Sequence, residues 1–72
     1  MDMGEILTDM RKVSGKTQKQ IAEHLGISER SWQNYESGVS DIRAHDFFRV
    51  ALFCQYDVLK VMTNFVNTKR MK

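Results

Sequence analysis

Residues 17–38 read TQKQIAEHLGISERSWQNYESG and contain the strongest structural signals in the sequence. Thr17 followed three residues later by Gln20 forms a capping-box pattern, which predicts a helix starting directly after Thr17. Gly26 suits the left-handed residue past a helix end, and Ser28 is a good N-cap for a second helix. Two short helices joined by three residues must cross at a steep angle. This is the helix-turn-helix arrangement, whose second helix can enter a DNA major groove.

The spacing within this stretch supports the same interpretation. Counting from Gln18, where the first of the two helices begins, a small residue follows after four positions, glycine after eight, and bulky apolar residues after fourteen and seventeen: Ala22, Gly26, Trp32 and Tyr35. The small residue lets the second helix approach closely, and glycine takes the positive φ of the turn. Five positions in one frame favour a helix-turn-helix over a chance pattern. The second helix is predicted to run to about residue 37.

The segments on either side are also predicted to be helical. Apolar residues recur at three- and four-residue spacing between Gly4 and Val13, which is typical of an amphipathic helix. Residues 39–43 are predicted to form a loop, followed by a helix ending near Gln55. Asp57 can cap a fifth helix that carries Val58, Leu59, Val61, Met62, Phe65 and Val66. We therefore expect an all-α fold of five helices, with residues 1–72 as a single domain, its core at about 4–67, and a short basic tail.

Composition narrows the class of protein. The chain has 72 residues, a net charge of +2 and one cysteine. This length allows one domain, and Cys54 can form neither an intramolecular disulfide nor a zinc site with a second cysteine, so we expect it to be a small core residue. No apolar run is long enough for a membrane span, and the first five residues lack the pattern of a signal peptide, so we expect a soluble, cytoplasmic protein.

Catalytic motifs are missing from the sequence. It contains no Gly-rich phosphate loop and suggests no Ser-His-Asp arrangement, so we expect no enzyme, no cofactor and no catalytic residue. His24 and His45 lack a Cys or His partner at zinc-finger spacing, so both are interpreted as surface residues rather than metal ligands.

The stretch from Thr17 to Gly38 resembles the phage repressor and Cro type of helix-turn-helix proteins, over roughly residues 4–62. The resemblance implies a five-helix, lambda-repressor-like domain that binds a double-stranded DNA operator, usually as a homodimer on an inverted repeat. Members include phage repressors, Cro proteins, restriction-modification controllers and antitoxins. Because we expect a single domain without a separate sensor domain, a Cro-like or controller-like repressor is favoured.

The resemblance also assigns roles to single residues. Glu29, Arg30 and Asn34 fall on base-reading positions, where Arg can pair with guanine, Asn with adenine, and Glu with cytosine or with the arginine beside it. The alternative for Arg30 is a solvated surface side chain. Backbone or edge contacts are expected from Gln18, as a phosphate clamp, and from Lys19, Ser28, Gln33 and Arg43; Ser28 can instead be a plain N-cap, and the other three can simply be exposed.

Some positions carry expectations about packing. Similar proteins pair the residues that correspond to Arg11 and Glu36, so we expect this ion pair, with two exposed charges as the alternative. Lys16 stands where the family is usually apolar, and its stem should lie along the core. The chain also lacks the proline that is common after Gly38, and Ala51 comes one residue later than the spacing predicts.

The C-terminal half carries more apolar residues than one small core can cover. An exposed apolar patch usually marks an interface, so we expect a homodimer whose contact includes Val58, Val61, Phe65 and, more weakly, Phe53. The alternative is an antitoxin-type protein whose C-terminal apolar surface binds a partner protein. The polar outward face of residues 28–37 favours DNA binding.

Overall fold

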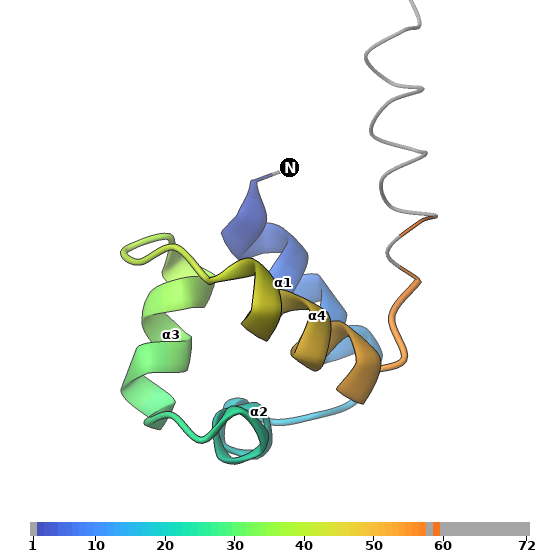
Figure 1. The fold of residues 1–72 in the computed structure, drawn as a ribbon, viewed down its shortest axis with the longest axis horizontal. Helices are drawn as coiled ribbons and strands as arrows, with labels where there is room; N and C mark the ends of the chain where they lie inside the picture. The colour runs from blue at the N-terminus through green and yellow to red at the C-terminus, as the bar shows by residue number, and fades with distance from the viewer. Residues whose placement is uncertain (1, 58, 60–72) are drawn as a thin grey trace, which may run out of the picture.

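The computed structural model describes residues 2–57 and 59, which contain four α-helices (Figure 1). The helices are α1 Met3–Val13, α2 Gln18–Leu25, α3 Glu29–Ser37 and α4 Ala44–Phe53. The all-helical prediction is confirmed for this part of the chain. The predicted fifth helix, at 58–66, lies outside the described residues except for residue 59, so a count of five helices is not supported.

The predicted caps set the bounds of α2 and α3. Thr17 Oγ1 accepts a hydrogen bond from Gln20 N at 3.1 Å, and Gln20 Oε1 accepts one from Thr17 N at 2.8 Å. These two bonds satisfy amide groups that the first turn of α2 leaves without partners. Gly26 ends α2 with φ at 73°, and Ser28 Oγ accepts from Ser31 N at 3.0 Å at the start of α3. The predicted turn between the two helices is therefore confirmed.

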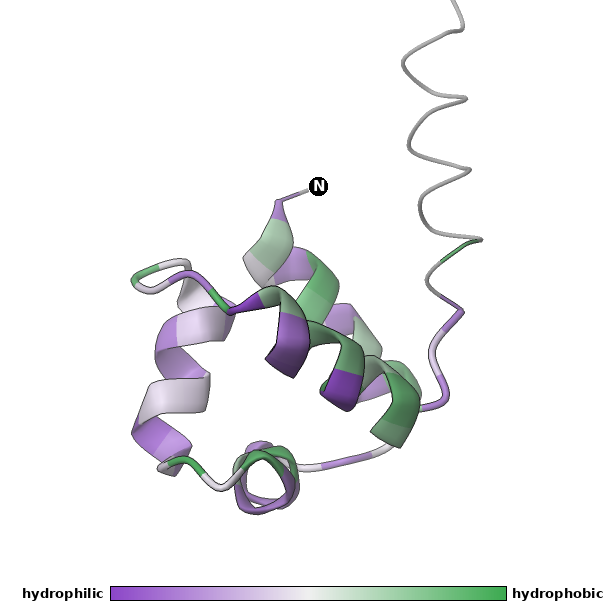
Figure 2. Ribbon diagram, viewed as in Figure 1, coloured by the Kyte–Doolittle hydropathy of each residue, from purple (hydrophilic) through white to green (hydrophobic). Residues whose placement is uncertain are grey.

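A single apolar core holds the four helices together. Trp32 of α3 is fully buried in this core, and Ala22 of α2 has a residual exposure of 2%. The other buried residues come from α1, α2, α4 and the residue after α4: Leu7, Met10, Ile21, Leu25, Val50, Ala51 and Cys54. Figure 2 shows the contrast between α4, which is largely apolar, and α3, which is largely polar. α3 thus joins the core through few residues and leaves most of its surface outside.

Close contact between α1 and α3 depends on Gly4. This glycine is buried, and a Cβ added to it would collide with the carbonyl oxygen of Glu36 and lie 3.3 Å from that of Tyr35. The missing side chain therefore lets the start of α1 lie directly against the backbone of α3.

α4 ends slightly earlier than predicted. The helix stops at Phe53 rather than near Gln55, because Gln55 adopts a left-handed conformation with φ at 53°. Tyr56 N then donates to Ala51 O at 2.9 Å, and the Tyr56 hydroxyl donates to Asp9 Oδ2 at 2.7 Å. The chain beyond α4 is thereby attached to α1. No helix in the described part of the chain is long and apolar enough to span a membrane.

Candidate nucleic-acid interface

The candidate recognition surface is the outward side of α3. Trp32 fixes the inward side, and its ring meets that of Tyr35 edge to face at 6.2 Å between centroids. Glu29 and Arg30, the first two residues of α3, are exposed, whereas Gln33 and Asn34 are half-buried. The structure therefore brings the three predicted base-reading residues, at 29, 30 and 34, to one polar surface.

The predicted pair of Arg11 and Glu36 is confirmed. Arg11 Nε lies 2.6 Å from Glu36 Oε2, and the two side chains are only 15% and 8% exposed. A second bond joins Arg11 to Glu36 Oε1 at 3.3 Å. The sequence did not indicate two further donors to this carboxylate, which are Trp32 Nε1 and Gln18 Nε2, the latter at 3.1 Å. One carboxylate thus connects α1, α2 and α3.

These contacts keep Glu36 charged. Burial acts to raise the pKa of this carboxyl group, but hydrogen bonds from Arg11, Gln18 and Trp32 and the positive charge of Arg11 outweigh it. The pKa of Glu36 consequently lies below its ordinary value of 4.5. At neutral pH the group is a carboxylate that can only accept hydrogen bonds.

Gln18, the predicted phosphate clamp, belongs to the same network. Besides donating to Glu36, it accepts a hydrogen bond at Oε1 from Gln33 Nε2 at 3.3 Å. Gln18 begins α2 and is half-buried, so it lies where α2 meets the recognition helix. Two residues that the sequence placed separately at the edge of the interface are thus in direct contact.

The remaining predicted backbone contacts differ in their surroundings. Lys19 and Arg43 are exposed, and neither forms an ion pair within residues 2–57. Ser28 caps α3 and also donates to Ser31 Oγ at 2.9 Å. The N-cap interpretation of Ser28 is therefore confirmed, while its contact with DNA stays a prediction.

Arg49 forms polar contacts that the sequence did not predict. It donates to the carbonyl oxygen of His24 at 3.0 Å and lies 3.5 Å from Asp46. The carbonyl is one of the orphan acceptors at the end of α2, and a cation is favourable there. Arg49 therefore links α4 to the helix that precedes the turn.

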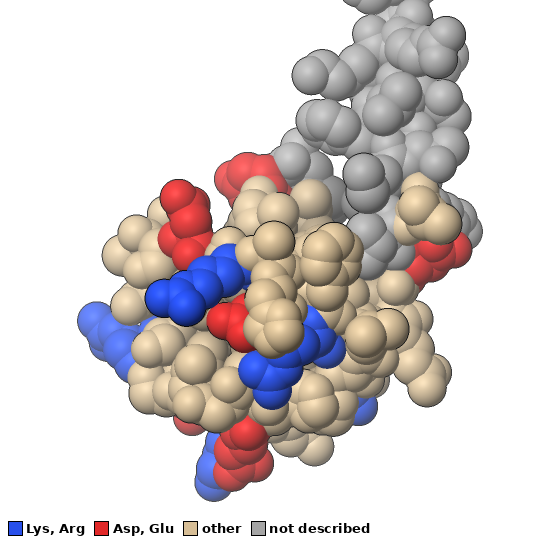
Figure 3. Space-filling view, in the orientation of Figure 1, with Lys and Arg blue, Asp and Glu red and all other residues tan. Residues whose placement is uncertain are grey.

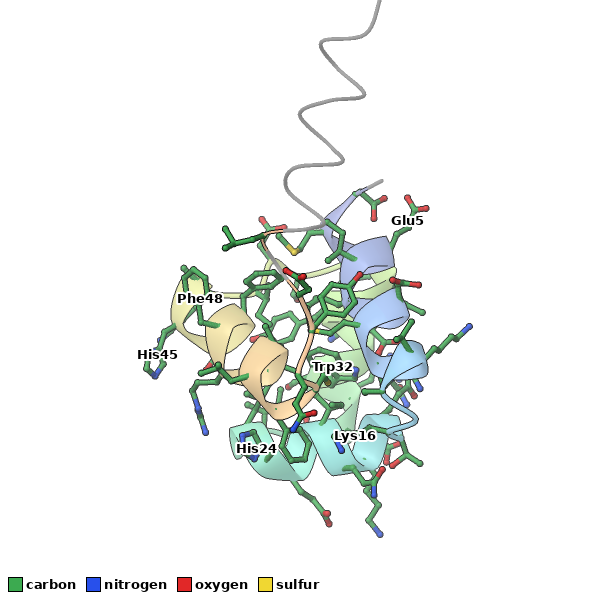
Figure 4. The ribbon with its side chains drawn as sticks, turned by 90° about the vertical axis from the view of Figure 1, so that its right-hand side faces the viewer. Glu5, Lys16, His24, Trp32, His45 and Phe48 are labelled. Carbon is green, nitrogen blue, oxygen red and sulfur yellow. The ribbon has the colours of Figure 1, made fainter. Side chains whose placement is uncertain are left out.

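Phe53 contacts two residues of its own chain. The ring of His24 stacks on it at 3.9 Å between centroids, and the ammonium group of Lys16 lies 4.6 Å from its centroid. Figure 4 shows Lys16 and His24 at the same end of the molecule, beside α2. His24 is exposed as predicted but packs on Phe53, and the ammonium group of Lys16 lies over the same ring. The other predicted dimer residues, Val58, Val61 and Phe65, lie outside the described residues.

Charges of both signs share the surface. Figure 3 shows Lys and Arg side chains interspersed with Asp and Glu on the visible face, with no continuous basic area. Within the described residues, no group of three His, Cys, Asp or Glu side chains is placed to hold a metal ion. The face drawn in Figure 3 therefore offers no broad positive area to a phosphate backbone.

A family model described as a helix-turn-helix domain matches residues 4–63. The match covers most of the chain, and the chain belongs to this helix-turn-helix family of DNA-binding domains. No curated protein and no solved structure matches the chain. The predicted helix-turn-helix class is confirmed, whereas the match does not distinguish the phage repressor and Cro type within it.

Proposed function

We propose that this protein is a sequence-specific transcriptional regulator, a Cro-like or controller-like repressor that binds an inverted-repeat operator. The observation that carries the proposal is the construction of α3. Trp32 anchors the helix in the core, while Glu29 and Arg30 project from it without a hydrogen-bonding partner in the described chain. A rigid helix with unpartnered polar side chains suits direct reading of base edges, and its activity would be binding rather than catalysis.

The proposed contacts fall into two classes. Arg30 pairs with guanine, Asn34 with adenine, and Glu29 accepts from cytosine or orients Arg30. Gln18, Lys19 and the other edge residues, Ser28, Gln33 and Arg43, position the domain on the phosphate backbone or at the edge of the site.

We further propose that two copies bind together. The outward side of α4 supports this, because Phe48 and Leu52 follow each other by one turn and are 58% and 79% exposed. Figure 4 shows Phe48 on the side of α4 away from α1. Leu59 is 76% exposed as well. A two-fold dimer through this surface and the predicted Val58, Val61 and Phe65 would repeat the recognition helix about 34 Å away, one DNA turn along the same face.

The same apolar surface favours one alternative, an antitoxin-type protein that uses it to bind a different protein. Sedimentation of the wild type and Leu52→Glu separates the two. A wild type that dimerises and a variant that does not would support the homodimer. A wild type that stays monomeric at about 100 µM and binds DNA without cooperativity would contradict it and favour the partner protein.

Selection of bound duplexes from random-sequence DNA tests the main proposal. We expect a palindromic motif, and Arg30→Ala should weaken binding by about 1 to 3 kcal/mol through one base position of each half-site. Lys19→Ala is the matched control and should weaken binding to all sequences alike. An Arg30→Ala variant that loses equal affinity on every single-base variant would contradict base reading by Arg30.

A further inference from the structure

A chain of hydrogen bonds connects the core ion pair to the outer surface of the recognition helix. Glu36 accepts from Gln18 Nε2 at 3.1 Å, and Gln18 Oε1 accepts from Gln33 Nε2 at 3.3 Å. Gln33 follows Glu29 by four residues on α3, so the two share a face of the helix. The chain therefore begins at a nearly buried carboxylate and ends beside the residues proposed to contact bases.

The charge of Glu36 sets the direction of this chain. A carboxylate only accepts hydrogen bonds, whereas a glutamine amide has a donor NH2 at one end and an acceptor oxygen at the other. Gln18 must therefore turn its NH2 toward Glu36, which leaves its oxygen for Gln33. Gln33 in turn gives its NH2 to Gln18. The Oε1 of Gln33 remains free to accept a hydrogen bond, because no donor within residues 2–57 reaches it.

We propose that Glu36 is a positioning residue for DNA specificity, because it makes Gln33 present a carbonyl oxygen to the base edges. The inference rests on the proposed function. In the major groove, this oxygen can accept from the amino groups of adenine and cytosine, whereas an NH2 would donate to N7 or O6 of guanine, O4 of thymine or N7 of adenine. Glu36 itself does not touch the DNA. It selects adenine or cytosine at the position that faces Gln33.

Glu36→Gln should reverse the chain. Oε2 of Glu36 accepts the short bond from Arg11 Nε and a bond from Trp32 Nε1, so the oxygen of the substituted amide takes that place. Its NH2 then replaces Oε1, at the expense of the longer bond of 3.3 Å from Arg11 Nη2. Gln18 must then present its oxygen to residue 36 and its NH2 to Gln33. The oxygen of Gln33 then accepts from the NH2 of Gln18, and the NH2 of Gln33 turns outward. The preferred base therefore changes from one that donates to one that accepts.

Parallel selections from random-sequence DNA duplexes test this reversal. With the wild type, we expect adenine or cytosine at one position of each half-site, and Gln33→Ala should remove this preference. With Glu36→Gln, the ratio of cytosine, which only donates in the major groove, to guanine and thymine at that position should fall by about tenfold. A merely structural loss lowers the folded fraction, weakens binding to all sequences alike and leaves this ratio unchanged.

Gln18→Leu provides the second variant, because it removes the middle of the chain but keeps the pair of Arg11 and Glu36. Gln18→Leu alone should lower the ratio of cytosine to guanine and thymine at the position that faces Gln33. This test remains available if Glu36→Gln does not fold. In this background, Glu36→Gln should have no further effect on the ratio, since the coupling passes through Gln18. Lys19→Ala, next to Gln18 but outside the network, should keep the wild-type preference.

The outcomes separate this inference from the function on which it rests. A wild-type motif that both Glu36→Gln and Gln18→Leu leave unchanged overturns the inference alone. So does a shift with Glu36→Gln that persists in the Gln18→Leu background. A wild-type protein that selects no motif overturns the proposed function, and the inference with it.

Discussion

Replacing Glu36 with Gln removes a charge from the core while keeping the size of the side chain. Arg11 then loses its ionic partner but keeps the carbonyl oxygen of Lys16 at 3.3 Å, and its side chain is 15% exposed. Breaking a buried pair by changing one partner costs about 3 to 5 kcal/mol. The partial exposure of Arg11 places the expected loss near the lower end, at about 3 kcal/mol. For a domain of this size, the melting temperature should fall by roughly 12 to 24 °C.

Urea and thermal unfolding, followed by helical circular dichroism, measure this loss. Glu23→Gln is the matched control, because Glu23 is an exposed glutamate of α2 without a hydrogen-bonding partner in the described chain. The control should change the free energy of unfolding by no more than about 0.5 kcal/mol. A Glu36→Gln variant as stable as the control would contradict a buried ion pair, since it would show that solvent screens the two charges.

The difference in stability between wild type and Glu36→Gln should also depend on pH. The pKa of Glu36 is lowered in the folded protein, so the unfolded chain takes up this proton first as the pH falls. The stabilising effect of the carboxylate is present above its unfolded pKa of about 4.5 and is lost as the pH falls through the folded pKa. The stability difference between wild type and Glu36→Gln should therefore shrink below about pH 4.5. A difference that stays constant into the acid range would contradict this assignment.

Two further predictions concern packing and the chain after α4. Gly4→Ala should destabilise the fold by about 1 to 3 kcal/mol, because the added Cβ meets the backbone of Glu36. The Cβ of Gly26→Ala meets no atom within 4 Å, so this variant should lose only about 1 to 2 kcal/mol through left-handed strain. Chemical denaturation measures both losses, and a loss near zero for Gly4→Ala would argue against the close contact of α1 with α3. Burial and the hydrogen bond to Asp9 raise the pKa of Tyr56 to about 12, so the stability of the wild type should fall as the pH rises from 10 to 12. Tyr56→Phe should remove most of this fall. If the stability of the variant has the same dependence on alkaline pH, the contact of Tyr56 with Asp9 does not contribute as expected.

The helix-turn-helix was predictable because local chemistry fixes it. The capping box of Thr17 and Gln20, the glycine at the turn and the hydroxyl of Ser28 each satisfy backbone groups within a few residues, so sequence spacing suffices. The bounds of α2 and α3 follow directly. Gly4 gave no such signal, because its importance depends on the backbone of Tyr35 and Glu36, which lie more than thirty residues away in the chain.

The candidate site was predictable in part. Periodicity placed Glu29, Arg30 and Asn34 on one outward face, and the resemblance supplied the pairing of Arg11 with Glu36. The contact of Gln18 with Gln33 was missed because helical periodicity gives the faces of each helix but not the rotamers with which two helices meet. Stacking of His24 on Phe53 was missed for the same reason, since the two residues are joined only by the packing of α2 on α4.

The network around Glu36 has a consequence for retargeting the protein to new operators. The side chains of Glu29, Arg30 and Asn34 make no hydrogen bonds to other described residues, so a library can randomise these positions independently while the scaffold stays constant. Gln33 offers no such independence, because any replacement changes what Gln18 must satisfy. A combinatorial design should therefore vary Gln18 and Gln33 as one unit and treat Glu36 as the switch that decides which pairs are compatible.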